Sequence, residues 1–346
     1  MLIPHPNHGT GHSRKNRGSL VFQVRETLEC LYRPGSSRHE AKALALGARQ
    51  SFADRFIFSS STLGLYIRFG ADFVKWVKKR HPDVRLLEDC KKHVDEYLEY
   101  LKETPSQYGR ARSVSTLKTV RSALAKLFGV TATDAFTDVG TRCRADIFRS
   151  RTASEKTKKA FDRDSDETLF TTATGVRRRE KRPVYASQIL ELDGVHFLTG
   201  IKGKGGRVRN APIICRDDDL QNILKYAESR GEEPLFPNMH SDFHGHSLRA
   251  LYACILYLLV ERPPDTLPRK EKYYCRADMQ GIVFDRRALR IVSLALGHNR
   301  IKIFPASYAY KLDEARRILS EPGWEGAHAR ARKAGHILLT GADKRL

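Results

Sequence analysis

The chain lacks the long apolar segments that mark membrane and secreted proteins. Its longest apolar run, from Leu251 to Val260, is far shorter than the roughly 20 residues that a membrane-spanning helix needs. This run instead predicts a buried core helix. The opening residues, MLIPHPNHGTGHSRKNRG, contain no continuous apolar core of the kind found in a secretory signal. We therefore expect a cytoplasmic protein that does not act in a membrane.

The sequence is also poor in metal-binding and nucleotide-binding patterns. Its six cysteines are scattered without a C-x-x-C pair, which argues against a disulfide framework and a structural zinc site. The segment HSDFHGH, with His240, His244 and His246, has ligand-like spacing, but no carboxylate or cysteine cluster accompanies it. A G-x-x-x-x-G-K-S/T phosphate loop is absent. We expect no metal, no cofactor and no nucleotide-hydrolysing motor.

Acidic residues are in short supply relative to basic ones. There are 40 Asp and Glu against 62 Lys and Arg, a formal net charge of +22. Such a surplus repels itself unless a polyanion is nearby, so nucleic acid is the expected partner and an anionic membrane surface is the rival. The 346 residues allow two globular domains, and a hydrophobic content of 40% can fill both cores.

Three amphipathic helices are expected between residues 51 and 135. Apolar residues recur at helical spacing in 62–79, in 87–103 ahead of Pro105, and in 114–128. Basic residues fall on the opposite faces. Ordinary solvation explains any single lysine there, but their recurrence on successive helices favours a surface that faces DNA. The candidates for this contact are Lys75, Lys78, Lys118 and Arg121.

A basic linker is expected over 136–163. Its arginines include Arg142, Arg144, Arg149 and Arg151, with few acidic residues among them. Side chains of this kind bind DNA phosphates, which adds affinity without sequence information. A plain flexible hinge between two domains has a similar composition.

The period of the sequence changes after residue 164. A helix is expected to end near Gly175 and to be followed by a turn that presents Arg177. The segment 189–213 alternates like two strands joined by a glycine-rich hairpin with Lys204 at its tip. His246 and Arg249 lie three residues apart at the start of the apolar helix, where backbone N–H groups favour an anionic oxygen. A further helix leads to His298.

These separated motifs, taken in order, resemble the tyrosine recombinase (phage integrase) family. The likeness is carried by ATGVRRRE, GKGGRVRNAPI, HSLR, LGHNR and a following tyrosine, and it is nearest to the integrases of bacterial conjugative and transposable elements. The residues at the matching positions are Arg177, Lys204, His246, Arg249, His298 and Tyr308.

The resemblance implies an α+β fold in which a mainly helical core-binding domain precedes a mixed α/β catalytic domain with a small antiparallel sheet. The expected divisions are an N-terminal segment at 1–50, the helical domain at 51–135, the linker at 136–163, the catalytic domain at 164–315 and a tail at 316–346. The first segment is either an arm-binding region or an extension of the helical domain. The tail is expected either to dock on a neighbouring protomer or to fold back on its own domain.

Two assignments remain open at this level. Tyr308 follows His298 by ten residues, where many members of the family have nine, and Tyr310 stands close by as a competitor. In the run Arg177, Arg178, Arg179, the residue after T-G-V matches the family position, so Arg177 is preferred over Arg178.

The resemblance also implies a role for each residue. Tyr308 attacks a phosphodiester to give a covalent 3′-phosphotyrosine, while Arg177 and Arg249 bind the non-bridging oxygens. A phenol is protonated at neutral pH and needs a partner, for which the family proposes His246. His298 then binds the scissile phosphate. Lys204 protonates the departing 5′ hydroxyl, so the reaction needs neither ATP nor divalent metal.

The expected partner is double-stranded DNA carrying an attachment or recombination site. Lys202 and Arg207, beside the hairpin tip, are further candidates for contact with it. The family implies a homotetramer on DNA, an association with the nucleoid and a possible accessory directionality factor. The alternatives are a telomere resolvase, a type IB topoisomerase-like enzyme or a DNA-binding protein that no longer cleaves.

Overall fold

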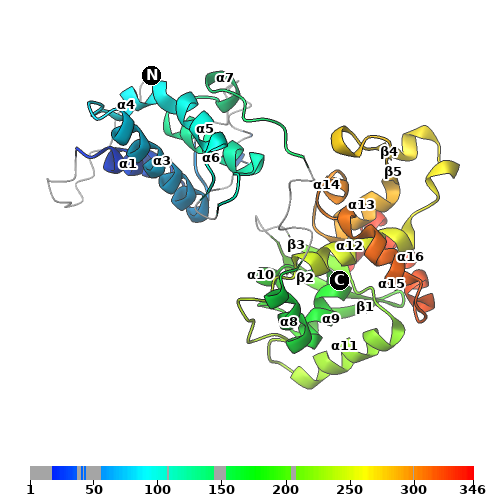
Figure 1. Cartoon of the computed structure of the whole chain (residues 1–346). Helices are drawn as coiled ribbons and strands as arrows, with labels where there is room; N and C mark the ends of the chain where they lie inside the picture. Colours follow the sequence, from blue (N-terminus) through cyan, green and yellow to red (C-terminus); the bar gives the residue numbers. More distant parts are fainter. Residues whose placement is uncertain are drawn as a thin grey trace. The chain divides into compact units, whose positions relative to one another are not determined.

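The chain forms two compact units, Met1–Arg142 and Cys143–Leu346, each with its own hydrophobic core. They are drawn together in Figure 1 and are described separately below. The computed structural model describes residues 18–36, 40, 41, 43, 56–106, 109–143, 153–203, 208–298 and 300–346.

The described part of the first unit is helical. Phe73 and Val77 from α3, Leu98 from α5 and Leu124 from α6 are buried together in its core. The spacing of these residues is the helical one that the sequence predicts. The helices are α1 (Leu20–Cys30), α3 (Ser60–Arg80), α4 (Leu87–Cys90), α5 (Val94–Glu103), α6 (Val114–Leu127) and α7 (Ala132–Ala135), with a 3₁₀ turn at Lys91–His93 between α4 and α5.

Two expectations for this unit need correction. The helix expected over 87–103 is divided into α4, the 3₁₀ turn and α5. Arg121, expected on an outward face of α6, is 7% exposed, and its guanidinium donates to the Phe136 carbonyl oxygen. The reason is positional: Arg121 lies four residues after Leu117 and three before Leu124, which puts it beside the buried stripe.

The second unit combines helices with two small antiparallel sheets, which confirms the α+β class. Its elements are α8 (Glu155–Arg163), α9 (Ser165–Thr174), α10 (Arg178–Lys181), β1 (Ile189–Leu192), β2 (Val195–Lys202), β3 (Val208–Pro212), α11 (Asp217–Arg230), α12 (His246–Val260), β4 (Lys272–Tyr274), β5 (Val283–Asp285), α13 (Arg286–Ala295), α14 (Ile303–Ser307), α15 (Leu312–Leu319) and α16 (Glu325–Thr340).

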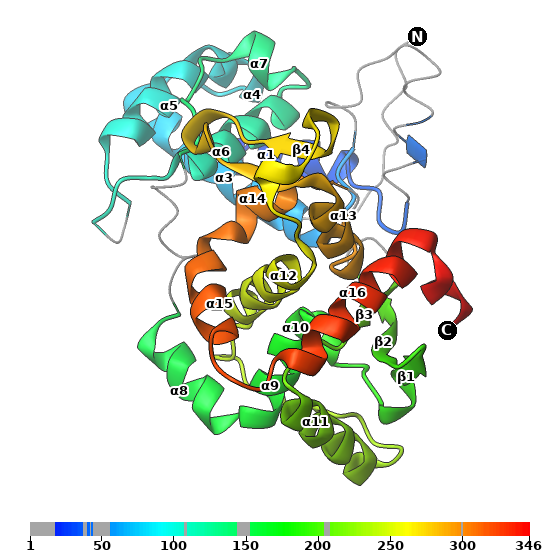
Figure 2. The ribbon, with the colours of Figure 1, turned by 90° about the vertical axis from the view of Figure 1, so that its right-hand side faces the viewer.

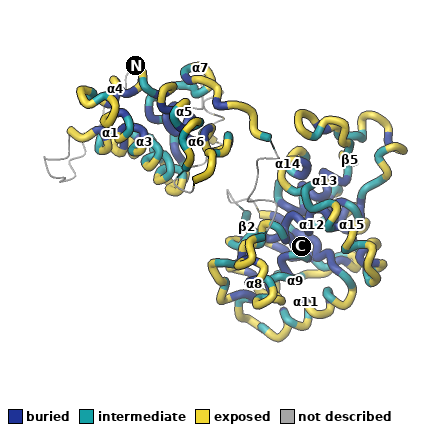
Figure 3. Tube along the Cα trace, in the orientation of Figure 1, coloured by how far each residue is buried: buried dark blue, intermediate teal, exposed yellow. Residues whose placement is uncertain are grey.

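Helix α12 is the centre of this unit. It packs against α9, α13, α15 and α16 (Figure 2), and nearly all of its residues after the first turn are buried (Figure 3). Its unbroken apolar sequence predicts this position, because a helix that is apolar on all sides has no face suited to water. Its first turn carries His246, which is exposed, and Arg249, which is buried.

The larger sheet has three strands, in the order β1-β2-β3. The sequence was expected to give two strands and one hairpin. The additional hairpin joins β1 to β2 through Asp193 and Gly194, which both have positive φ, with Leu192 paired to Val195. A two-residue Asp-Gly connection of this kind suits the twist of antiparallel strands. The hairpin after β2 contains residues 204–207, which lie outside the described residues.

The C-terminal segment folds on its own unit. Helix α15 runs through residue 315, and Trp324, Ala327, Ala331 and Ile337 are buried in the same core as α12. Of the two arrangements open from sequence, the structure has the tail packed in cis. Among the described helices, none combines the length and apolarity needed to cross a membrane.

Candidate active site

A tight turn after α9 prepares one side of the site. Gly175 ends the helix with φ of +63°, a left-handed conformation that glycine adopts without strain. A Cβ at this position would lie 2.4 Å from Cδ1 of the buried Tyr252, so the turn also depends on the missing side chain. The Gly175 carbonyl oxygen accepts a hydrogen bond from Arg249, which ties α12 to this turn.

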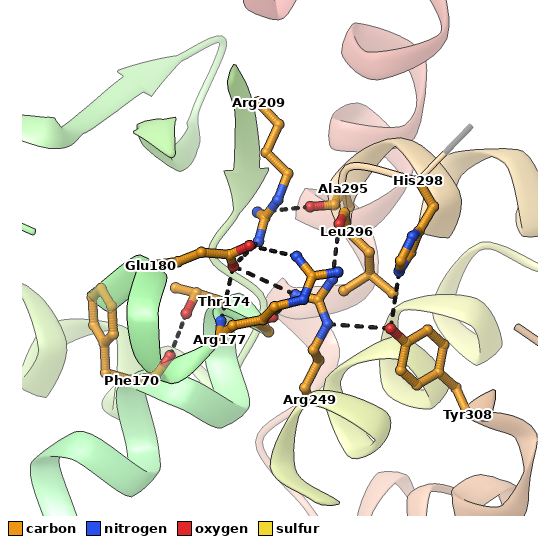
Figure 4. A network of polar contacts seen from close by, with 11 residues as sticks. Phe170, Thr174, Arg177, Glu180, Arg209, Arg249, Ala295, Leu296, His298 and Tyr308 are labelled. Carbon is orange, nitrogen blue, oxygen red and sulfur yellow. Dashed lines mark hydrogen bonds and ion pairs between the residues drawn. The ribbon is translucent and has the colours of Figure 1, made fainter. Parts of the chain in front are cut away.

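Tyr308 lies at the end of α14, with its hydroxyl group held between two side chains. The hydroxyl oxygen is 3.2 Å from Nε of Arg249 and 3.0 Å from Nε2 of His298. Arg249 is 1% exposed and also donates to the Leu296 carbonyl oxygen at 2.8 Å. Figure 4 shows the three side chains converging from α12, from the turn after α13 and from α14.

A single buried carboxylate, Glu180 of α10, joins three arginines (Figure 4). Arg177 donates to it through both its backbone N–H, at 2.8 Å, and its guanidinium. Arg209 of β3 donates at 2.8 Å, and Nη1 of Arg249 lies 3.8 Å away. Since these groups engage both carboxylate oxygens, Glu180 is a poor candidate for binding a cation.

The cluster keeps its charges despite burial. Burial raises the pKa of Glu180, but the neighbouring Arg209, Arg177 and Arg249 together hold that pKa below its ordinary value. Burial and the adjacent Arg249 lower the pKa of Arg209 to about 10, which leaves it protonated at neutral pH. Three guanidiniums and one carboxylate therefore give an electropositive site around the tyrosine hydroxyl.

His298 is the neutral partner in this site. Burial, followed by the charges of Arg249 and Arg177, lowers its pKa to about 4. Its backbone N–H donates to the Ser293 carbonyl oxygen at 2.7 Å, and the Ser293 hydroxyl donates back to the His298 carbonyl oxygen at 2.9 Å. These two contacts fix the backbone from which the ring reaches Tyr308.

His246 lies at the expected start of α12 but does not make the expected contact with the tyrosine. It begins α12 and is exposed, and no hydrogen bond links its ring to Tyr308 among the described residues. Partial desolvation, with Arg249 and Arg177, lowers the pKa of His246, so it too is neutral at neutral pH. The tyrosine partner in the structure is thus His298, where the sequence analysis expected His246.

The geometry also bears on the two assignments left open. Arg178 donates to the carbonyl oxygens of Met239 and Ser241, at 3.1 and 3.4 Å, so it braces a loop while Arg177 joins the cluster. Tyr310 makes no hydrogen bond to Arg249 or His298 within the described structure, and burial raises the pKa of Tyr310 to about 12. Both observations favour Arg177 and Tyr308.

The remaining expected residues fall into two groups. Exposed positions are occupied by Lys75, Lys78, Lys118, Arg142 and Lys202. The catalytic candidate Lys204 and the DNA-contact candidates Arg144, Arg149, Arg151 and Arg207 lie outside the described residues.

Sequence reasoning missed Glu180 and Arg209. Glu180 stands three residues after Arg177, a spacing that lets a helix N-terminus form reciprocal contacts, and this signal was available. Arg209 had no such signal. Residue type alone favours Val208 inside and Arg209 outside, but Val208 is 60% exposed and Arg209 is 8% exposed, because alternation along β3 puts Arg209 on the same face as the buried Ala211.

Comparison with known proteins gives distant structural likenesses only. No family model matches the chain, and no curated protein matches it. It is similar to the XerH site-specific recombinase bound to palindromic difH substrate in a post-cleavage complex, with 15% identity, a TM-score of 0.45 and coverage of 87% of this chain and 95% of that one. A pre-cleavage complex of XerH with difH gives 17% identity and a TM-score of 0.42 at the same coverage.

A third likeness is to the XerA recombinase, at 13% identity and a TM-score of 0.27, covering 82% of this chain and 95% of that one. Identities and TM-scores of this size do not carry a function from one protein to another.

Proposed function

We propose that this protein is a site-specific DNA recombinase that breaks and rejoins strands through a covalent 3′-phosphotyrosine. One observation carries the proposal: the Tyr308 hydroxyl lies between a buried guanidinium, Arg249, at 3.2 Å and a neutral imidazole, His298, at 3.0 Å. A cation stabilises a developing phenolate, and a neutral ring nitrogen accepts its proton. The pair therefore has what a tyrosine nucleophile requires.

The proposed step balances as follows. The Tyr308 oxygen attacks phosphorus, its proton passes to Nε2 of His298, and the bond from phosphorus to the 5′ oxygen breaks. That oxygen leaves as a hydroxyl after taking a proton from an acid, for which Lys204 remains the candidate. Attack by the 5′ hydroxyl of a partner strand reverses the step, so the bond energy is conserved and no nucleotide is consumed.

The arginine cluster would serve the transition state. Charge builds on the non-bridging oxygens during the displacement, and fixed guanidiniums stabilise it at no cost in reorganisation. The Arg177 side chain is 29% exposed, so its guanidinium is open to a ligand while Glu180 holds it in place. His246 lies near this group at the exposed start of α12, where it would contact the phosphate instead of the tyrosine.

DNA binding is supported by the net charge of +22 and by the exposed Lys75, Lys78 and Lys118 of the first unit. On this proposal four copies synapse two sites and exchange strands, which integrates or excises a mobile element of the bacterial conjugative or transposable kind. An accessory directionality factor would bias the outcome. The protein would then work on the nucleoid in the cytoplasm.

The test is formation of a covalent adduct. The full chain is incubated, with a chelator present, with nicked suicide duplexes taken from the flanks of its own gene, labelled on either side of the nick. We expect an adduct on a denaturing gel that keeps the label on the 3′-phosphate side. Tyr308→Phe should abolish it, and Tyr310→Phe, the matched control two residues away, should retain it.

Other outcomes would redirect the assignment. An adduct lost only in Tyr310→Phe moves the nucleophile by two residues, and an adduct that keeps the label on the 5′-hydroxyl side of the cleaved bond contradicts the 3′ linkage. Relaxation of supercoiled DNA without strand exchange between two duplexes indicates a topoisomerase. Tight binding to these duplexes with no adduct in any variant contradicts the proposed reaction.

A further inference from the structure

A second cluster of chemically active side chains lies in the first unit, apart from the residues of the candidate active site. His81 directly follows α3, His93 ends the 3₁₀ turn ahead of α5, and Glu96 is in the first turn of α5. Among the described residues, these three form the one group whose potential ligand atoms all lie within 4.8 Å of one another. Nothing in the recombination reaction makes use of them.

The distances from the Glu96 carboxylate to the two rings are compatible with a shared ion. Oε2 of Glu96 lies 3.3 Å from Nε2 of His81 and 3.5 Å from Nδ1 of His93. The first is a long hydrogen bond, and the second lies beyond the usual range of about 2.7–3.2 Å. Two ligands that each bond to a tetrahedral Zn²⁺ at about 2.0–2.1 Å are separated by about 3.4 Å. Both observed separations are close to that value.

Neighbouring contacts indicate which atom each of the three side chains could offer to an ion. Arg80 contacts Oε1 of Glu96 at 3.3 Å, so Oε2 is the oxygen directed at the two rings. Nε2 of His93 is buried without a hydrogen-bond partner in the described structure, and Nδ1 is the ring nitrogen that faces Glu96. The two imidazoles are stacked, with centroids 3.8 Å apart, so one ring has to turn before both nitrogens point at a single ion. The side chain of His81 is about one third exposed, which permits the small rotation that ligation would need.

We propose that His81, His93 and Glu96 bind a divalent transition-metal ion of the Zn²⁺ class, with water in the fourth position. Two imidazoles and a carboxylate suit zinc and its neighbours better than Ca²⁺ or Mg²⁺, which prefer oxygen ligands alone. The ion would fasten the end of α3 to the start of α5. Its role is structural and does not depend on the proposed recombinase activity.

Metal binding is tested on the full chain after chelator treatment and dialysis. We expect it to bind one equivalent of Zn²⁺ in competition with a chromophoric chelator, and to bind Co²⁺ with visible d–d absorption of a tetrahedral site. Glu96→Gln, which keeps the side-chain shape, and His81→Gln should each weaken binding by about 100-fold or abolish it. The matched control is the double variant His240→Gln and His244→Gln, which removes histidines of HSDFHGH and should bind as the parent does.

A second readout locates the ion. The ring of Trp76 lies 6.4 Å from that of His81, centroid to centroid, while the other tryptophan, Trp324, is in the second unit. Paramagnetic Co²⁺ should therefore quench about half of the tryptophan emission, and Glu96→Gln should prevent this. Circular dichroism of metal-free Glu96→Gln checks that it is folded. Absence of stoichiometric binding, binding that survives Glu96→Gln, or binding lost in the HSDFHGH variant would overturn the proposal.

Discussion

Replacement of Gly297 by alanine tests whether the arginine cluster depends on close backbone packing. Gly297 follows α13, precedes His298 and has φ of +70°. A Cβ built on it would lie 2.5 Å from Cδ and 3.0 Å from Nε of Arg209. The Arg209 side chain cannot move aside without losing hydrogen bonds, because its guanidinium donates to the Ala295 carbonyl oxygen at 3.0 Å and to Glu180 at 2.8 Å.

Two costs add at this position. A left-handed conformation costs a non-glycine residue about 1–2 kcal/mol, and forcing extra volume into a packed interior costs about 1–3 kcal/mol. We therefore expect Gly297→Ala to lower the free energy of unfolding by about 2–5 kcal/mol. Because displacement of Arg209 also moves Glu180 and the backbone of His298, adduct formation should slow by about 10- to 100-fold, the size of effect that an ångström of misplacement produces.

Gly341→Ala is the matched control. Gly341 ends α16 with φ of +77°, so alanine suffers the same backbone strain, but the nearest atoms, of Lys344, are 3.8 Å from the added Cβ. We expect a loss of about 1–2 kcal/mol and an unchanged rate of adduct formation. Urea unfolding and single-turnover adduct assays measure the two effects. If both variants lose equal stability and cleave equally fast, the packing of Gly297 on Arg209 does not support the site.

Two further predictions concern buried titratable groups. The folded protein holds the pKa of His298 at about 4, below its ordinary value of 6.5. Between pH 6.5 and pH 4 the His298 ring therefore gains a proton only in the unfolded chain, so the free energy of unfolding decreases as the pH falls. His298→Gln should reduce the slope of unfolding free energy against pH by up to about 1.4 kcal/mol per unit in that window, and parallel urea titrations with equal slopes would contradict this. Lys181, buried against Glu167, Thr171 and Phe243, should cost about 3–5 kcal/mol when replaced by methionine, because Glu167 is left unpaired. The double variant Lys181→Met and Glu167→Leu should recover most of that stability in thermal unfolding, and a double variant no more stable than the single one would show that the pair is not the cause.

Much of the fold follows from local patterns. The helix expected over 114–128 is α6, Val114–Leu127, because its apolar residues recur every three or four positions and the Ser113 hydroxyl accepts from the Thr116 N–H at its start. The long apolar run predicts α12 equally well. The hairpin between β1 and β2 could also have been predicted, since Asp193-Gly194 is a strong two-residue turn signal. The prediction instead placed the turn in the glycine-rich segment that follows.

The errors arise where a distant partner overrides a local pattern. Arg121 is charged and lies beside an apolar stripe, so the sequence predicts that its side chain faces solvent. In the structure its guanidinium is buried and donates a hydrogen bond to the carbonyl oxygen of Phe136, 15 residues away. The same origin explains why His298 contacts Tyr308 where His246 was expected to do so. Their distances to Tyr308 depend on how α12, α13 and α14 pack, and a motif gives the order of such residues without their separations.

The burial of Arg209 on the inner face of β3 explains why an otherwise costly cluster forms. Three guanidiniums against one carboxylate leave two positive charges uncompensated in a largely buried site, an arrangement that desolvation opposes. Glu180 offsets part of this repulsion by accepting hydrogen bonds from both Arg177 and Arg209. Nε of Arg249 donates instead to the Tyr308 hydroxyl. An apolar residue at position 209 would suit this buried strand face but would remove one of the three guanidiniums beside Glu180. On the proposed function, an anionic phosphate bound at the site would neutralise the surplus charge.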